Sequence, residues 1–211
     1  MDVYNTEEEQ VQAIKQWWKE NTVSLISGIV IGIVVLVGYK FWTESKQNQA
    51  QQASALYSQI LSTKGDKTES TDILKNNYSG TPYAALSALL VAKDNLLANE
   101  TDKAISQLKW VLDNNSDVGL EHIARQRLAR LYLSQDKIEA AESLIKGKKA
   151  AGYLATYNEI RGDIYLAKKS PVQAKESYRT ALSALARGDR RYEIIKMKLD
   201  DLTQENKANE K

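Results

Sequence analysis

Residues 160–182 read IRGDIYLAKKSPVQAKESYRTAL, and this stretch decides the fold of the 211-residue chain. A polar turn divides it where Ser170 is followed by Pro171, a pair that favours a helix N-cap and the first helical turn. Gly162 lies before this turn, and Ala174 lies twelve residues after Gly162. Small residues at such positions let two helices cross closely, because larger side chains would hold the backbones apart. The stretch therefore predicts a closely packed pair of helices.

The same spacing of small residues occurs twice more, upstream of this stretch. Ala92 precedes Ala104 by twelve residues, and Ala129 precedes Ala141 by twelve. Successive units are thus offset by 37 and 33 residues, close to the period of about 34 that marks tetratricopeptide repeats. Further residues that agree with this repeat pattern are Val91, Leu108, Val111, Leu128, Tyr132, Ile145, Tyr165, Tyr178 and Ala181. We predict an all-α fold in which three helix pairs form a tetratricopeptide-like solenoid.

Two residues depart from the repeat pattern, and a further helix is predicted after the third repeat. Arg161 stands where an apolar residue is usual, and Asn95 replaces the tyrosine of the other two units. Residues 192–202 form an amphipathic segment that fits the terminal cap a solenoid needs. Its apolar side is predicted to carry Ile194, Ile195, Leu199 and Leu202. Residues 204–211 are predicted to be a disordered tail.

An apolar segment near the N-terminus predicts a membrane span. Residues 21–39 carry no charge, and residues 23–37 read VSLISGIVIGIVVLV. Nineteen residues extend about 28 Å as a helix, close to the roughly 30 Å of the hydrocarbon core. Aromatic residues suited to the membrane interfaces flank the segment on both sides: Trp17, Trp18, Tyr39, Phe41 and Trp42. The predicted organisation is an N-terminal segment over 1–20, a transmembrane helix over 21–42 and the repeat domain over 43–203.

Other interpretations of the apolar segment are less consistent with the sequence. A cleaved signal peptide has a shorter apolar region and small residues at its cut site, where this chain has Tyr39 and Phe41. Orientation stays open, because two lysines lie on each side of the span. Gly28 and Gly32 form a G-x-x-x-G pair that would let another transmembrane helix approach, although such pairs also arise in spans without a partner.

Between the span and the repeats, we predict a stalk helix that leaves the membrane and joins the domain. It reads TESKQNQAQQASALYSQIL over residues 43–61, polar at first and then apolar at helical spacing. Residues 64–70, KGDKTES, are predicted to be a turn. The Thr81-Pro82 pair then marks the start of the next helix.

The composition argues against an enzyme. Cysteine is absent, which removes disulfides and cysteine-ligated metals, and no phosphate-binding G-x-x-x-x-G-K-[ST] motif is present. The single histidine, His122, is expected to be a surface or partly packed side chain. Basic and acidic residues number 29 and 27 and are interspersed, unlike the clustered positive charge of nucleic-acid-binding proteins. No catalytic residue, metal or cofactor is therefore expected.

The remaining candidate surface is the concave groove that the first helix of each repeat would line. Counted from the small residues of those helices, the groove positions are Leu89, Lys93, Leu96, Gln126, Arg130, Leu133, Glu159, Asp163 and Leu166. Leucines among charged residues would suit unfolded or extended polypeptide. The alternative is that some of these leucines belong to the core, if the register is shifted by one.

The first forty-two residues, MDVYNTEEEQVQAIKQWWKEN followed by the span and YKFW, resemble the YfgM family of Gram-negative inner-membrane proteins. Residues 160–182 resemble that family's domain as well. Thr22 stands where the family often has glycine, and the C-terminal tail is longer than in some members. The resemblance implies a cytoplasmic N-terminal segment, one span in the inner membrane and a periplasmic repeat domain. It also implies an ancillary role at the SecYEG translocon, in company with the membrane-anchored chaperone PpiD.

Two functions follow as hypotheses. The first is a non-enzymatic, chaperone-like translocon accessory that binds PpiD, emerging secretory polypeptides or both. The second is a membrane-anchored scaffold or regulator of envelope stress signalling that binds folded partners. Membrane lipid would surround the span in either case, and no nucleic-acid partner is expected.

Overall fold

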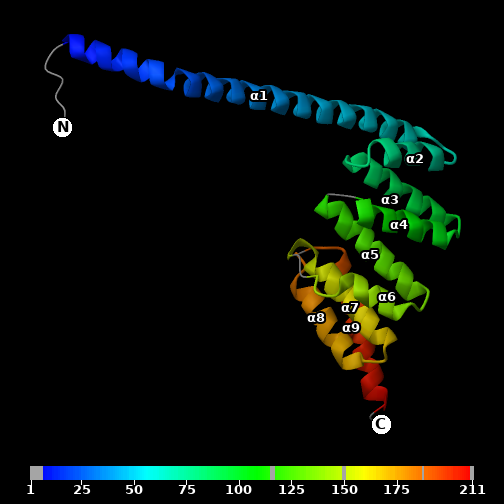
Figure 1. Cartoon of the computed structure of the whole chain (residues 1–211). Helices are drawn as coiled ribbons and strands as arrows, with labels where there is room; N and C mark the ends of the chain where they lie inside the picture. Colours follow the sequence, from blue (N-terminus) through cyan, green and yellow to red (C-terminus); the bar gives the residue numbers. More distant parts are fainter. Residues whose placement is uncertain (1–6, 115–116, 149–150, 187, 210–211) are drawn as a thin grey trace. The chain divides into compact units, whose positions relative to one another are not determined.

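The computed structural model of the chain describes residues 7–114, 117–148, 151–186 and 188–209, and these residues contain helices and no strand (Figure 1). The all-α prediction is confirmed. The elements are α1 (Glu7–Ser62), α2 (Thr68–Asn77), α3 (Pro82–Leu97), α4 (Thr101–Asn114), α5 (Val118–Ser134), α6 (Ile138–Ile145), the 3-10 turn η1 (Ala151–Tyr153), α7 (Leu154–Ala167), α8 (Pro171–Ser183) and α9 (Arg191–Asn209). The chain divides into two units, residues 1–51 and 52–211, with the boundary inside α1.

The N-terminal unit is built on the first part of α1. Within the described part of the chain, α1 is the one helix long and apolar enough to cross a membrane. Its apolar side chains face outward; Val23 is 79 % exposed and Leu36 is 69 % exposed. Such a surface needs lipid or another protein to cover it. The predicted apolar helix is therefore present, and it continues without a break through the predicted stalk to Ser62.

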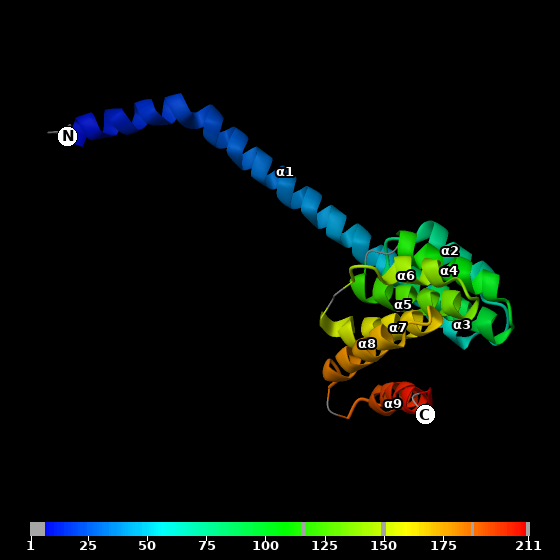
Figure 2. The same cartoon turned by 90° about the horizontal axis from the view of Figure 1, so that it is seen from below.

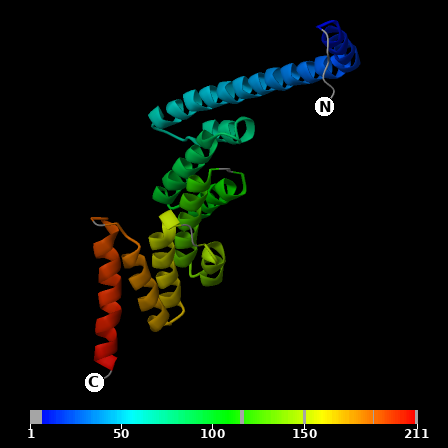
Figure 3. The ribbon, with the colours of Figure 1, turned by 90° about the vertical axis from the view of Figure 1, so that its left-hand side faces the viewer.

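The C-terminal unit contains the three predicted helix pairs, which follow one another along the chain (Figure 3). Helix α3 packs on α4, α5 on α6 and α7 on α8. We call the first helix of each pair A (α3, α5, α7) and the second B (α4, α6, α8). The alanines predicted at the crossings are at most 1 % exposed: Ala92, Ala104, Ala129, Ala141 and Ala174. Their burial confirms the spacing that identified the repeats.

The turn between helices A and B has the same backbone conformation in all three pairs. Its left-handed residue is Asn99, Asp136 or Lys169, with φ between 56° and 62°. In each pair the following N–H donates 2.8 Å back to a carbonyl five residues earlier: Glu100 to Asn95, Lys137 to Tyr132 and Ser170 to Tyr165. This bond and the left-handed residue together form the Schellman motif that ends many helices. The repeat is therefore visible in the backbone as well as in the side chains.

The third repeat has glycine, Gly162, where the other two have alanine, and the reason is steric. A Cβ atom built on Gly162 would lie 2.6 Å from Cδ1 of Tyr178, a separation that real Cβ atoms essentially never show. Tyr178 is fully buried, so its ring has little freedom to move aside. The third crossing accommodates an aromatic ring because the facing helix has no side chain at this point.

Helix α2 was not predicted and corrects one boundary. It begins at Thr68, inside the stretch 64–70 that was predicted to be a turn. Leu74 is fully buried, in one cluster with Ala53 and Ile60 of α1 and Ala84 of α3. The segment was missed because TESTDILKNN holds only two large apolar residues, too few to show a helical period. The end of α1 and α2 therefore cover the first repeat.

The predicted cap is helix α9, which lies beside α8 at the end of the domain (Figure 2). Ile195 and Leu202 are buried and Leu199 packs against them, as predicted, but Ile194 is 52 % exposed and does not belong to the buried side. The helix runs to Asn209, past the predicted boundary at residue 203. Residues 204–209 are therefore helical in backbone, since Gln, Glu, Lys and Ala favour helices; residues 210–211 lie outside the described residues.

Candidate docking groove

Helices α3, α5 and α7 pack side by side, while the B helices pack on them from the other side. The A helices therefore present one continuous face. Each of their small residues (Ala92, Ala129 and Gly162) serves as an anchor from which the predicted groove residues form three rows. These rows lie three residues before the anchor, one residue after it and four residues after it.

The row one residue after the anchor opens to solvent. Lys93 and Arg130 are exposed, and Asp163 is half-buried. In the row four residues after the anchor, Leu96 and Leu133 are half-buried, whereas Leu166 is 44 % exposed. These two rows lie on the open face, as the repeat spacing predicted.

The row before the anchor lies deeper, and one of its residues corrects the prediction. Leu89 is only 6 % exposed and belongs to the core cluster around Leu108 and Leu128, so it does not line the groove. Gln126 is half-buried. Glu159 is 8 % exposed, yet its carboxylate is held by ion pairs from the helices on either side.

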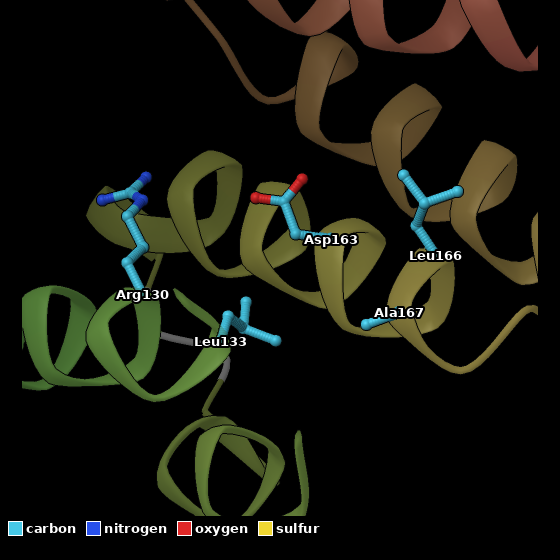
Figure 4. Close-up of a pocket in the computed structure, with 5 residues that line it drawn as sticks. All are labelled: Arg130, Leu133, Asp163, Leu166 and Ala167. Carbon is cyan, nitrogen blue, oxygen red and sulfur yellow. The ribbon is translucent and has the colours of Figure 1, made fainter. Parts of the chain in front are cut away.

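A cavity of about 470 Å³ lies between α5 and α7. Arg130 and Leu133 of α5 and Asp163, Leu166 and Ala167 of α7 line it (Figure 4). Four of these five residues were predicted from the sequence. Ala167 was missed, although it lies four residues after Asp163 and therefore on the same side of α7. The lining combines apolar and charged side chains, which suits a peptide side chain and its polar backbone.

Charged side chains link the helices along this face. Nη2 of Arg130 lies 3.1 Å from a Glu159 oxygen, joining α5 to α7. Nζ of Lys198, on α9, lies 3.0 Å from Glu159 and 2.8 Å from Asp163. Burial opposes the charge of Lys198, but its bonds to the two carboxylates outweigh burial, so the pKa of Lys198 is raised. The cap helix is thereby fastened to the acidic part of the groove.

Asp163 connects the groove to the packing of the third repeat. It accepts a hydrogen bond of 2.6 Å from the hydroxyl of Tyr178 on α8. Burial, and secondarily this bond to Asp163, raise the pKa of Tyr178, so the hydroxyl stays protonated and acts as a donor. Lys198 and Tyr178 were not predicted at the groove. No spacing within one helix reveals that they converge on an acid of α7.

His122 does not line the cavity and is buried, which corrects the prediction of a surface or partly packed side chain. Its Nδ1 lies 2.5 Å from the hydroxyl oxygen of Tyr157, and its ring lies 4.3 Å from that of Tyr153. Burial lowers the pKa of His122 and raises that of Tyr157 to about 12, so both are neutral near pH 7. This contact joins α5 to α7 and is a packing element.

The two glycines of the predicted transmembrane contact lie on an open helix surface. A Cβ atom added at Gly28 or Gly32 would meet nothing within 4 Å. That surface is free for a second helix, and the contact itself remains a prediction. Among the residues that the structure describes, no group of three or more His, Asp or Glu side chains is arranged to hold a metal ion.

The fold defines a class: a helical-repeat protein with one N-terminal helix long and apolar enough to cross a membrane. Over residues 15–204, the chain matches the family described as tetratricopeptide repeat-like domain. No solved structure matches it.

Curated proteins named ancillary SecYEG translocon subunit are similar to this chain over nearly its whole length. The protein from Aggregatibacter actinomycetemcomitans is 30 % identical, with 94 % of this chain and 99 % of the relative covered. Those from Escherichia coli K12 and Neisseria gonorrhoeae are 28 % and 27 % identical, each with 96 % of this chain and 100 % of the relative covered. The chain belongs to the family of ancillary SecYEG translocon subunits, which confirms the resemblance found in its sequence.

Proposed function

We propose that this chain is a non-enzymatic accessory of the SecYEG translocon. Its N-terminal segment lies in the cytoplasm, α1 crosses the inner membrane once, and the repeat domain lies in the periplasm. There the groove binds extended segments of secretory polypeptides as they emerge. The anchor keeps the groove near the membrane and so raises its effective concentration at the exit of the pore.

The cavity between α5 and α7 is the observation that carries this proposal. Leu166 is 44 % exposed at its edge, and Leu133 is half-buried beside it. An exposed leucine next to a cavity binds an apolar side chain better than it binds water. The similar proteins are named ancillary SecYEG translocon subunits, which supports a position of this groove beside the translocon.

PpiD is the folded partner that the family resemblance suggests. We propose that it binds beside the chain through the span, where Gly28 and Gly32 leave an open surface on α1. Glycines at this spacing permit the close backbone approach on which helix association in membranes depends. Client binding by the groove and partner binding by the span would then use separate surfaces.

Site-specific photocrosslinking in cells tests both surfaces. A photoreactive residue at Leu166 probes the groove, and one at Val172 of α8, which is 73 % exposed, is its matched control. A residue at Gly32 probes the glycine surface, and one at Val30, rotated about 200° from Gly28 around the helix, is the control there. The expected result is crosslinks from Leu166 to nascent secretory chains and from Gly32 to PpiD or SecY, with neither control reacting.

The outcomes separate the two functional hypotheses. Crosslinks from Leu166 to folded envelope proteins, with none to emerging chains, would contradict the translocon role and support the scaffold or stress-signalling regulator. Equal crosslinking from Leu166 and Val172 would mean that the groove has no special part in binding.

A further inference from the structure

The charges along the groove are unevenly distributed. The carboxylates of the face, Glu159 and Asp163, both come from α7, and Arg130 and Lys198 already pair with them. Lys93 of α3 and Arg127 of α5 are exposed, and neither has an ion pair within the described residues. The part of the groove over α3 and α5 therefore carries positive charge that the domain itself does not neutralise.

The acids of α3 and α5 do not offset this charge. Asp94 of α3 pairs with Lys67 at 2.7 Å. Glu121 of α5 pairs with Arg125 of the same helix. Both carboxylates are thus already engaged with other cations, and the positive charge over α3 and α5 stays available to a partner.

Arg127 is placed on the open face by its contacts. Its Nη1 donates to the carbonyl of Leu89 at 3.5 Å, so the side chain reaches from α5 to α3. Helix α4 packs on both α3 and α5 and covers the other side of this junction. An exposed side chain that bridges the two helices must therefore lie on the groove side. Lys93 lies there too, because it occupies the same repeat position as Arg130.

The spacing of the helices relates these cations to the cavity between α5 and α7. Packed helices lie about 8–10 Å apart, and an extended chain advances about 3.3 Å per residue. A segment that crosses the A helices with an apolar side chain between α5 and α7 therefore reaches the α3–α5 junction about three residues away. A carboxylate at that point would meet Lys93 and Arg127.

We propose that the groove selects extended polypeptide segments in which an acidic residue lies about three residues from an apolar one. The apolar side chain occupies the cavity beside Leu133 and Leu166, and the carboxylate pairs with Lys93 and Arg127. This inference rests on the proposed function, because it names the kind of client segment that the groove takes. Its physical basis is the unneutralised charge of α3 and α5 beside a cavity that offers the apolar side chains of Leu133 and Leu166.

Fluorescence anisotropy with the full chain in mild detergent tests the inference. The probe is a fluorescein-labelled peptide of about twelve residues, long enough to cross the three A helices. It carries one leucine and two glutamates about three residues away, in a serine and glycine background. Two matched peptides replace the glutamates by lysines or the leucine by serine.

The expected result is that the glutamate peptide binds about tenfold more tightly than the lysine peptide at low ionic strength, and that salt narrows the difference. Lys93→Glu is expected to weaken glutamate-peptide binding about threefold or more. Lys109→Glu, the same change at an exposed lysine of α4, is the matched control and leaves binding unchanged. Leu166→Ser weakens binding of both leucine peptides, whereas Val172→Ser on α8 does not.

Two outcomes overturn the inference in distinguishable ways. If both leucine peptides bind equally and only Leu166→Ser weakens them, the groove takes apolar segments without charge selection, and the proposed function stands alone. If no peptide binds and Leu166 forms no crosslinks in cells, both the inference and the proposed binding function of the groove are refuted. Equal effects of Lys93→Glu and Lys109→Glu would assign the preference to net charge and also refute the inference.

Discussion

The second and third repeats share a backbone plan and differ in what fills the crossing of their two helices. In the second, Ala129, Ala141 and Ile145 form a wholly apolar cluster. In the third, Gly162 makes room for Tyr178, whose hydroxyl reaches Asp163 and, through that acid, Lys198 of the cap. Outside this cluster, Arg125 of α5 donates to the carbonyl of Leu144 of α6 at 3.2 Å, so the second repeat joins only its own two helices in this way. The third repeat also connects its core to the groove through Asp163 and to helix α9 through Lys198. These connections depend on the space that Gly162 leaves for the ring of Tyr178.

Gly162→Ala tests this difference most strongly. The added methyl group would collide with the buried ring of Tyr178, and overpacking of this kind costs about 1–3 kcal/mol of the free energy of unfolding. Urea unfolding followed by circular dichroism measures the loss. The reverse change in the second repeat, Ala129→Gly, is the control, and it is expected to cost about 1 kcal/mol or more through helix propensity and a lost buried methyl. Unchanged stability of Gly162→Ala would show that the ring can move aside.

Lys198→Ala tests the connection between the third repeat and the cap. It removes the cation shared by Glu159 and Asp163 while the side chains of the second repeat stay intact. A cost of about 1 kcal/mol is expected, because Lys198 is only partly exposed and its bonds are charge-assisted. Hydrogen exchange should show the loss first in α9. Lys196→Ala, at an exposed neighbour, is the control; equal exchange in the two variants would contradict the fastening role.

Lys169→Gly is expected to stabilise the third repeat. Lys169 has a φ of 56°, a left-handed conformation that a lysine adopts at a cost and glycine adopts freely. The expected gain is about 0.5–1 kcal/mol in urea unfolding. Asn99→Gly in the first repeat should gain less, because asparagine tolerates this conformation. A larger gain from Asn99→Gly would mean that the turn is set by something other than its left-handed residue.

The contact between the two repeats at His122 is expected to make stability depend on pH. Burial places the pKa of His122 in the folded chain below its ordinary value of 6.5, although Glu121 partly opposes the shift. Lys148 and Arg125 also face the ring and disfavour a second positive charge. The unfolded chain therefore takes up a proton first, and stability falls as pH drops below about 6.5.

His122→Gln removes this titration, and its unfolding should depend less on pH between about 6.5 and 5 than that of the unchanged chain. Tm measured across this interval for both proteins is the test. If Tm depended on pH equally in the two proteins, carboxylates elsewhere in the chain would govern the loss of stability at acid pH.

The sequence alone determined the elements whose signals are local. The uncharged run 21–39 defined the apolar helix, because a span needs length and no charge. The spacing of Ala129 to Ala141 and of Gly162 to Ala174 identified the helix pairs, since close crossing demands small residues. The same count placed Arg130, Leu133, Asp163 and Leu166 around the cavity. Positions that recur at a fixed spacing can be predicted from the sequence of each helix without knowledge of its neighbours.

Tertiary structure alone decided what depends on neighbours distant in the sequence. Helix α2 was missed because it has few apolar residues. They are enough to hold the helix in place only because α1 and α3 cover them. Leu89 is core because α4 and α5 close over it. Lys198 reaches Asp163 from thirty-five residues away and Glu159 from thirty-nine. The physical reason is the same in each case: burial and ion pairing depend on which surfaces meet, and periodicity within one helix records only which side faces inward.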